Sequence, residues 1–336
     1  MSGNLIEVRG LKKSFQVTRG AILRRVVGVT TAVDNVDLDI KEGEILGCVG
    51  GSGSGKSTLG RLILRLIEAD EGRINFAGRE LTGLSFKQMC PLRREMQIVF
   101  QDPLHSLNPR RTVAENVERP LLNFGVPRAE ARGRMAELLT MVGLDPTQSH
   151  KYPHEYSGGQ CQRIAIARAL ALRPRFLFLD EPVSSLDVSI QAQILKLLLD
   201  LQQRLKLTFL FVSHDLKIVR QIAHRTVVMY RGRLLELGDS DAVYRSPMHP
   251  FTKNFLGTVL HVRKGGRWEL AAQRAEDLED LNRQSATHAA PQAGCVYAGA
   301  CAERFLPCAS ERPPLFRATD DRWVACHLYR PPQAAQ

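Results

Sequence analysis

Residues 50–57 of this 336-residue chain read Gly-Gly-Ser-Gly-Ser-Gly-Lys-Ser and fit the pattern G-x-x-x-x-G-K-S/T. The apolar run at 44–49 before this stretch predicts a strand, and residues 58–67 after it carry apolar side chains at helical spacing. Glycines in such a loop let successive backbone N–H groups approach a phosphate without a Cβ in the way. The order strand, glycine loop and helix predicts a site that binds the phosphates of a nucleotide. The alternative is a glycine-rich turn without a ligand.

The loop supplies a set of candidate phosphate contacts. The helix N-terminus after it faces the phosphates. Lys56 brings a positive charge to the β and γ phosphates, and the Ser57 hydroxyl is a hard oxygen ligand that suits Mg²⁺. The candidate ATP contacts are Gly50, Gly51, Ser52, Gly53, Ser54, Gly55, Lys56, Ser57 and Thr58.

Composition narrows the class of protein. The chain has 44% hydrophobic residues, enough for a core, and a net charge of +11, which nucleotide, nucleic acid or an anionic lipid surface could each balance. No apolar run approaches the roughly 18 to 20 residues that a membrane span needs. Residues 1–10 lack a signal pattern, so we expect a cytosolic chain. Its seven cysteines are then expected to be thiols or metal ligands.

Strands alternate with helices along most of the chain, which predicts an α/β fold with a mainly parallel core sheet. Residues 33–40 alternate apolar and polar side chains, as in an antiparallel strand, and 102–172 form a helical insert. We predict a nucleotide-binding domain at 1–260, a polar linker at 261–294 and a small cysteine-containing extension at 295–336.

Polar residues follow three of the predicted strands. Asp180 follows an apolar strand, at the sheet edge where α/β proteins bind ligands, and is expected to hold Mg²⁺ through water. Glu181 is placed to accept a proton from the attacking water. Gln101 can orient water and Mg²⁺, and His214 can donate to the γ-phosphate. Taken singly, Gln101 or His214 would more often be an ordinary polar residue at a strand end.

With Ser157-Gly158-Gly159-Gln160 included, the chain resembles the ATP-binding subunits of ABC transporters over about residues 5–260. The resemblance implies that two such domains pair head to tail, with each ATP between the P-loop of one and this signature motif of the other. It further implies that Gln101 is the Q-loop residue, His214 the switch histidine, Asp187 a D-loop contact and Phe15 the adenine platform. A plain core phenylalanine is the alternative for Phe15.

Other segments look similar to the ATPases of oligopeptide and dipeptide permeases. This resemblance implies a peripheral subunit on the cytoplasmic face of a bacterial inner membrane. Its partners would be a second ATPase chain that differs from this one, two transmembrane permease subunits and a periplasmic or extracellular substrate-binding protein. Nickel, glutathione and opine importers share the same likeness. The segments are Ser106-Leu107-Asn108-Pro109-Arg110, Tyr152-Pro153-His154-Glu155, His249-Pro250-Phe251-Thr252 and the tail with Cys326-His327.

Two rival functions are disfavoured by the motifs. A nucleotide kinase on a P-loop scaffold needs neither the signature nor Glu181 and His214. A soluble ABC ATPase acting on nucleic acid, which the charge of +11 could favour, typically has two cassettes or a long coiled-coil insert. Neither feature is present, so we expect no nucleic-acid partner.

The tail carries four cysteines, Cys295, Cys301, Cys308 and Cys326, with spacing C-x5-C-x6-C-x17-C. A module of about 40 residues usually needs a metal, a disulfide or a partner to hold its shape. Four thiolates suit zinc, although the paired C-x2-C of many zinc sites is absent, and they equally suit a four-iron, four-sulfur (4Fe–4S) cluster. The similar tails of peptide-permease ATPases are associated with such a cluster, so the resemblance favours 4Fe–4S, with zinc as the alternative.

Overall fold

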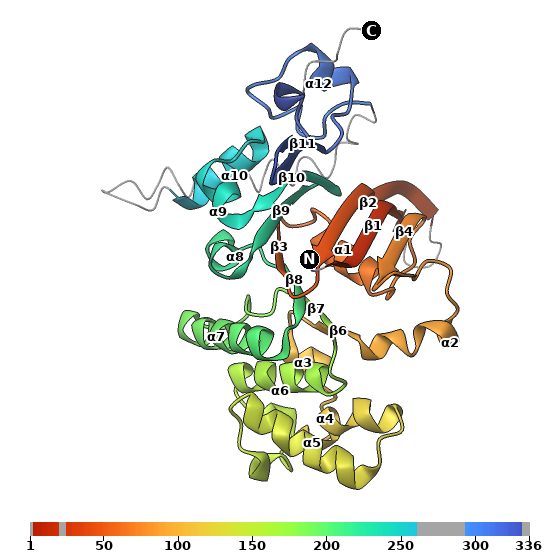
Figure 1. Cartoon of the computed structure of the whole chain (residues 1–336), viewed down its shortest axis with the longest axis vertical. Helices are drawn as coiled ribbons and strands as arrows, with labels where there is room; N and C mark the ends of the chain where they lie inside the picture. Colours follow the sequence, from red (N-terminus) through yellow and green to blue (C-terminus); the bar gives the residue numbers. More distant parts are fainter. Residues whose placement is uncertain (1–2, 20–24, 261–292, 331–336) are drawn as a thin grey trace.

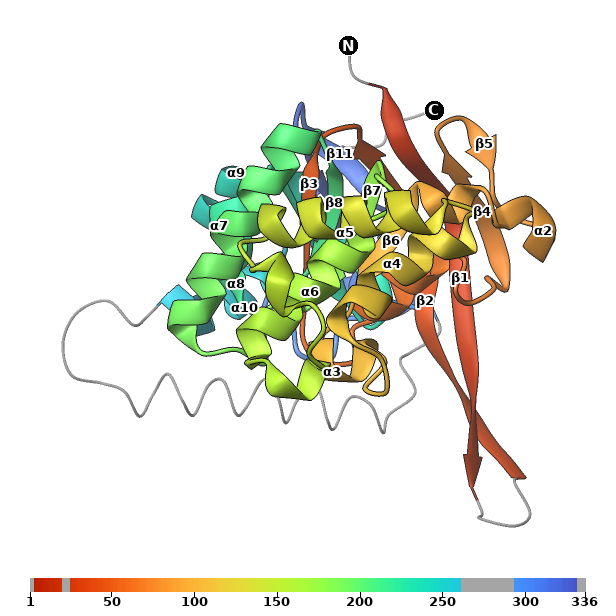
Figure 2. The same cartoon turned by 90° about the horizontal axis from the view of Figure 1, so that it is seen from below.

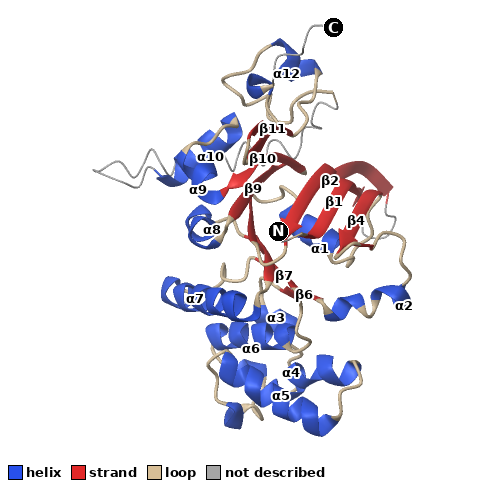
Figure 3. Ribbon diagram, viewed as in Figure 1, coloured by secondary structure: helices blue, strands red, loops and turns tan. Residues whose placement is uncertain are grey.

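Two sheets organise the computed structural model, which describes residues 3–19, 25–260 and 293–330. A four-stranded sheet has the order β2-β1-β4-β5, and an eight-stranded sheet has the order β11-β12-β10-β9-β3-β8-β7-β6. Figures 1 and 3 show the smaller sheet beside the centre of the larger one, with the helices of residues 103–170 and 188–205 below both. The predicted linker lies outside the described residues except for 293 and 294.

The smaller sheet is antiparallel, as the alternating pattern at 33–40 predicts. Its two longest strands continue past the body of the molecule as a ribbon (Figure 2). Near the body, the inward side chains of this sheet are buried, including Val33 and Ile40. The strands are β1 (Asn4–Arg19), β2 (Arg25–Lys41), β4 (Glu71–Phe76) and β5 (Arg79–Glu80).

The larger sheet has a parallel centre, β9-β3-β8-β7-β6, and an antiparallel edge, β10, β12 and β11. Every residue of β3, β7 and β8 is buried, as strands covered on both faces require. The predicted mainly parallel α/β fold is confirmed. The strands are β3 (Ile45–Val49), β6 (Met96–Val99), β7 (Phe176–Asp180), β8 (Thr208–Val212), β9 (Arg225–Tyr230), β10 (Arg233–Asp239), β11 (Phe316–Thr319) and β12 (Arg322–Val324).

The helices cover the parallel strands and form a separate helical layer. The first helix ends at Ile63, before the predicted residue 67, because Arg65 turns into the left-handed region with φ 49°. The helices are α1 (Lys56–Ile63), α2 (Phe86–Met89), α3 (Pro103–Ser106), α4 (Val113–Asn123), α5 (Arg128–Met141), α6 (Gly158–Leu170), α7 (Val188–Leu205), α8 (Leu216–Ile222), α9 (Ser240–Arg245), α10 (Pro250–Leu260) and α12 (Leu306–Ser310). Short 3-10 turns lie at η1 (Leu92–Arg94), η2 (Pro146–Gln148), η3 (Pro153–Glu155) and η4 (His327–Tyr329).

Helices α3 to α6 form the helical insert, which lies between β6 and β7 in the chain. Two of these helices begin with a capping box. The hydroxyl of the residue before the helix accepts from the backbone N–H of the third helical residue, and the side chain of that third residue accepts from the backbone N–H of the residue before the helix. Thr112 pairs with Glu115 at the start of α4, and Ser157 pairs with Gln160 at the start of α6. The insert therefore has well-defined helix starts, one of them at the signature motif.

The cysteine-containing extension completes the core sheet. Strand β12 pairs with β10, and the Arg322 guanidinium of β12 forms a buried ion pair with the Glu236 carboxylate of β10. Glu236 also accepts hydrogen bonds from the backbone N–H groups of Met248 and His249, both at 2.9 Å. This one carboxylate thus joins the extension, the last core strand and the segment before α10.

Candidate functional site

The glycine loop lies between β3 and α1, as predicted, and two of its glycines are required by close backbone contacts. A Cβ on Gly50 would lie 2.2 Å from the Met229 carbonyl oxygen. A Cβ on Gly55, whose φ is 103°, would lie 2.1 Å from the Ala32 carbonyl oxygen of β2. Both distances are shorter than any side-chain contact allows. The loop is therefore held between β9 and the antiparallel sheet.

Lys56 begins α1 and points its ammonium back into the loop. Its Nζ donates to the carbonyl oxygens of Gly50 and Gly51, each at 2.9 Å. Burial lowers the pKa of Lys56, because the charged form loses hydration. A buried cation held by weak carbonyl acceptors is suited to exchange them for the oxygens of a phosphate.

Ser57 and Asp180 meet across the loop. The Ser57 Oγ donates to Asp180 Oδ1 at 2.6 Å, and the Arg61 guanidinium lies 3.5 Å from Asp180 Oδ2. Burial raises the pKa of Asp180, while the hydrogen bond from Ser57 and the charge of Arg61 act in the opposite direction. A hydroxyl and a carboxylate side by side form a donor set that Mg²⁺ prefers.

Glu181 follows β7 in the left-handed region, with φ 49°. Such backbone costs roughly 1 to 3 kcal/mol and is common at functional sites. Its Oε2 accepts from the Gln101 amide at 3.2 Å and from the His214 Nδ1 at 3.0 Å. Because a carboxylate only accepts, His214 carries its proton on Nδ1. Three residues predicted from separate strand ends therefore meet at one carboxylate.

The signature residues belong to a different layer from the loop. Ser157 Oγ accepts from the Gln160 N–H at 3.3 Å, and Gln160 Oε1 accepts from the Ser157 N–H at 2.9 Å. A Cβ on Gly159 would lie 2.5 Å from the Ile190 side chain of α7, so this glycine also allows α6 and α7 to pack closely. Asp187 precedes α7 as its N-cap residue. Figure 1 shows α6 in the helical layer and α1 beside the antiparallel sheet.

Phe15 lies on β1 with 42% of its surface exposed, so it is not a core residue. The Lys13 ammonium lies 5.7 Å from the centre of its ring. The contact of Ala32 with Gly55 brings the neighbouring strand β2 against the glycine loop. An exposed aromatic ring on this sheet can offer a stacking face to a nucleotide base.

The four tail cysteines line one small cavity of about 10 Å³, together with His249 and His327. Cys295, Cys308 and Cys326 are buried, and Cys301 is half-buried. Burial raises the pKa of Cys295 and Cys301, and that of Cys326 to about 11. Across 3–19, 25–260 and 293–330, no three His, Cys, Asp or Glu residues are grouped closely enough to hold a metal ion.

His249 has a buried environment that its sequence motif does not indicate. The residue is 1% exposed and its Nδ1 accepts from the Phe251 N–H at 2.9 Å. Its Nε2 has no hydrogen-bond partner among the described residues. Burial lowers the pKa of His249 to about 3. In the sequence, His249 is marked only by its place in the segment 249–252. That segment resembles the peptide-permease ATPases but does not indicate which groups His249 contacts.

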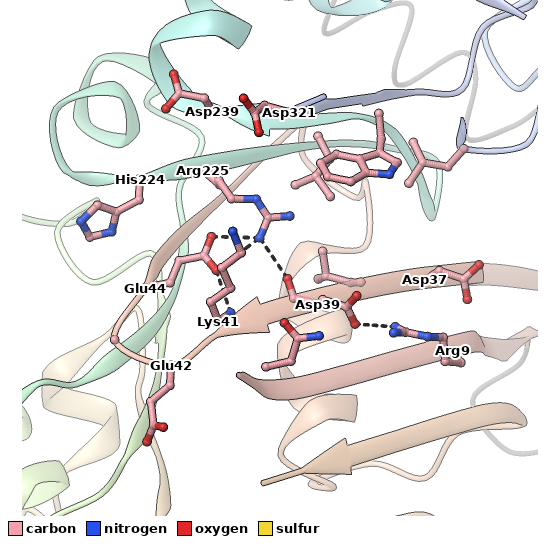
Figure 4. A pocket seen from close by; sticks show the side chains of 16 residues that line it. Arg9, Asp37, Asp39, Lys41, Glu42, Glu44, His224, Arg225, Asp239 and Asp321 are labelled. Atoms are coloured by element: carbon pink, nitrogen blue, oxygen red, sulfur yellow. Dashed lines mark hydrogen bonds and ion pairs between the residues drawn. The ribbon is translucent and has the colours of Figure 1, made fainter. Parts of the chain in front are cut away.

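The largest cavity described, about 780 Å³, lies elsewhere. Figure 4 shows it between β2, the start of β3 and the edge of β10, crossed by the pairs Arg9 with Asp39 and Arg225 with Glu44. Glu44 precedes the N-terminal end of β3, whereas the glycine loop follows its C-terminal end. None of the predicted site residues lines this cavity.

Comparisons with known proteins agree with this geometry. The family model described as ABC transporter matches residues 33–184. The oligopeptide transport ATP-binding protein AppF of Bacillus subtilis is 42% identical over 327 residues, 97% of each chain. The dimeric post-hydrolysis state of the ATP-binding cassette MJ0796 bound to ADP and Pi is 31% identical, with a TM-score of 0.62 over 70% of this chain and 98% of that one. The cbiO1 protein from Clostridium perfringens, part of the ABC transporter complex cbiONQ, is 31% identical, with a TM-score of 0.63 over 72% and 91%.

Proposed function

This chain belongs to the ABC transporter ATP-binding proteins, and we propose that it powers the import of di- or oligopeptides. The family makes it an ATPase and the ATP-hydrolysing subunit of a transporter. The peptide assignment is supported by the 42% identity to AppF over 97% of both chains, a match that includes the tail. The observation that carries the hydrolytic role is the meeting of Gln101 and His214 at Glu181.

Some residues of the nucleotide site bind ATP, and others act on the protons of the hydrolysis reaction. Lys56 and the loop N–H groups bind the β and γ phosphates, and Phe15 stacks on the adenine. Ser57, Asp180 and Gln101 would hold Mg²⁺, which offsets phosphate charge when bound. Glu181 accepts a proton from the attacking water. His214 would donate its Nδ1–H to the γ-phosphate once that N–H leaves Glu181.

A second ATPase subunit completes each site. The N-terminus of α6, with Ser157, Gly158, Gly159 and Gln160, offers N–H groups to the γ-phosphate of an ATP presented by the partner. Asp187 contacts the same interface. The solved cassette MJ0796 is dimeric, which supports this arrangement.

Membrane partners are part of the proposal. In the described ranges, no helix is long and apolar enough to cross a membrane. Two permease subunits would provide the channel, and a binding protein outside the membrane would deliver the peptide. The region from Gln101 to Gly143 would dock on the permease at the cytoplasmic face. A change at the γ-phosphate could reach this region because Gln101, at its start, contacts Glu181 directly.

A nickel, glutathione or opine importer is the alternative, since an ATPase subunit does not touch the cargo. The test is to copurify the assembled complex, identify its chains by mass spectrometry and measure what its binding protein binds. We expect two permease chains, a second ATPase and selective binding of di- or oligopeptides. A binding protein that takes nickel or glutathione but no peptide would contradict the peptide assignment.

We also propose that the tail cysteines hold a 4Fe–4S cluster, with zinc as the alternative. Four thiols around one cavity, with a buried unpaired histidine nitrogen beside them, suit such a group. In the part of the chain described, no three such ligands are grouped closely enough to hold a metal ion. The thiols would therefore have to rearrange to bind either group, and the choice of 4Fe–4S over zinc rests on the resemblance of the tail to those of peptide-permease ATPases.

The cavity of about 10 Å³ has room for about one water, so the thiols must move apart to admit a cluster. The test is anaerobic purification with iron, sulfide and zinc analysis. We expect brown protein with about four iron and four sulfide per chain, both lost in Cys301→Ser. Colourless protein with stoichiometric zinc would overturn the iron–sulfur assignment.

A further inference from the structure

We propose that His249 is a positioning residue of the cysteine site, whose Nε2–H donates a hydrogen bond to a cysteine sulfur that holds the metal group. The proposal rests on the proposed metal site in the tail. His249 comes from the segment before α10 in the nucleotide-binding domain, and it lines the same cavity as Cys295, Cys301, Cys308 and Cys326. It would therefore be the contribution of that domain to a site built by the extension.

The hydrogen bond at Nδ1 determines which nitrogen carries the proton. Nδ1 accepts from the Phe251 backbone N–H at 2.9 Å, so this nitrogen bears no hydrogen. A neutral imidazole then has its proton on Nε2. A protonated Nε2 cannot bind a metal, because its lone pair is used. His249 is thus a hydrogen-bond donor into the cavity and not a further metal ligand.

Among the described residues, the Nε2–H forms no hydrogen bond of ordinary geometry. The residue is 1% exposed, so bulk water does not reach this donor, and leaving it unpaired is unfavourable. The Ala325 backbone lies close enough to the ring to compete as an acceptor. Metal-bound thiolates are acceptors of the required kind, and the cysteines that supply them line the same cavity.

The ring is held in place from several sides. The His249 backbone N–H donates to Glu236 Oε2 at 2.9 Å, and Glu236 is ion-paired with Arg322 of the extension. The Tyr297 ring centre lies 6.0 Å from that of His249. The backbone of His249 is thus fixed to the core strand, and its ring lies between the Phe251 N–H and Tyr297. These contacts hold the imidazole where it lines the cysteine cavity.

A hydrogen bond to a cluster sulfur stabilises the reduced form, which carries one more negative charge, and so raises the reduction potential. Removing only the Nε2–H should lower that potential without emptying the site. Substitution of His249 by each of the two amide residues tests the roles of its two ring nitrogens separately. Asparagine can place an acceptor near Nδ1, to receive the Phe251 N–H, but does not reach the Nε2 position. Glutamine can extend an N–H group to the Nε2 position.

The experiment compares wild type, His249→Asn and His249→Gln as full chains purified without oxygen, by potentiometric titration followed with electron paramagnetic resonance. We expect His249→Asn to retain its iron and sulfide, with a reduced-to-oxidised ratio about tenfold lower at the wild-type midpoint, a shift of about 59 mV for one electron. His249→Gln should lie closer to wild type. Loss of iron in His249→Asn with retention in His249→Gln would also support the proposal.

Unchanged midpoints in both variants with full iron would overturn the proposal, because Nε2 would then use another acceptor such as the Ala325 carbonyl. Loss of iron in both variants with the fold intact would also overturn it. If wild type holds zinc, the iron–sulfur assignment fails separately, and His249 is tested with Co²⁺ in place of zinc. The sulfur-to-cobalt absorption band should then shift in His249→Asn and not in His249→Gln. A wild-type tail that binds no metal refutes both proposals while leaving the ATPase assignment intact.

Discussion

The glycine loop of the nucleotide site and the cysteine cavity differ in whether their buried polar groups are hydrogen-bonded within the chain. In the loop, Lys56 bonds two carbonyl oxygens and Ser57 bonds Asp180, so each group has a partner within the chain. In the cavity, the buried Nε2 of His249 has none. Groups that pair with one another suit a ligand that binds and leaves in every cycle. A buried donor left unpaired suits a group that stays in place, since its cost is offset only when that group is present.

Glu181→Gln, at the nucleotide site, is expected to give the largest effect of the substitutions considered, a loss of ATP hydrolysis. The amide cannot take a proton, so ATP hydrolysis should fall by about 100-fold or more while ATP binding persists. Turnover and bound ATP are measured on the assembled transporter at saturating ATP. Glu80→Gln, exposed on β5 and outside the proposed permease-docking region, is the matched control and should change neither. Near wild-type turnover in Glu181→Gln would refute its role as the base.

Arg322→Met tests whether the cysteine site is anchored in the core of the nucleotide domain. Removing the cation leaves Glu236 buried without its charge partner, which typically costs about 3 to 5 kcal/mol of unfolding free energy. Arg245→Met removes an exposed pair with Asp241 and should cost less than about 1 kcal/mol. Denaturant unfolding of the two variants measures the difference. Equal losses would mean that the extension is only loosely attached.

Phe15→Ala tests the adenine platform at the rim of the nucleotide site. Loss of ring stacking should weaken ATP binding by about 1 to 3 kcal/mol, whereas Phe15→Tyr should retain it. Phe86→Ala on α2 is the control, since this ring is 75% exposed. Affinity is measured by titration with a fluorescent nucleotide. Equal affinity in Phe15→Ala and Phe86→Ala would remove Phe15 from the site.

Ser157→Ala and Ser85→Ala separate helix capping from a role in catalysis. Both residues cap a helix in the same way, so each loss should cost about 1 kcal/mol of stability. Only Ser157→Ala should also lower ATP turnover of the assembled transporter, because Ser157 would face the partner's ATP. If turnover falls equally in both variants, the effect belongs to folding and not to the nucleotide interface.

The nucleotide site could be predicted from the sequence because each of its parts is a short local pattern. Gln101, Glu181 and His214 each end a strand, and parallel strands bring such ends to one edge. The pair between Glu236 and Arg322 joins residues far apart in the chain, and no local pattern indicates it. The cysteine spacing likewise identifies donors, but the unpaired nitrogen of His249 depends on packing that only the structure describes.

Peptide uptake by the reconstituted importer is the most direct test of the central claim. Vesicles that enclose ATP would receive the binding protein and a labelled dipeptide from outside, and uptake would be compared with phosphate release. We expect ATP-dependent accumulation of the dipeptide that stops in Glu181→Gln while ATP remains bound. Accumulation of nickel or glutathione without peptide, or equal peptide uptake in Glu181→Gln, would contradict the account.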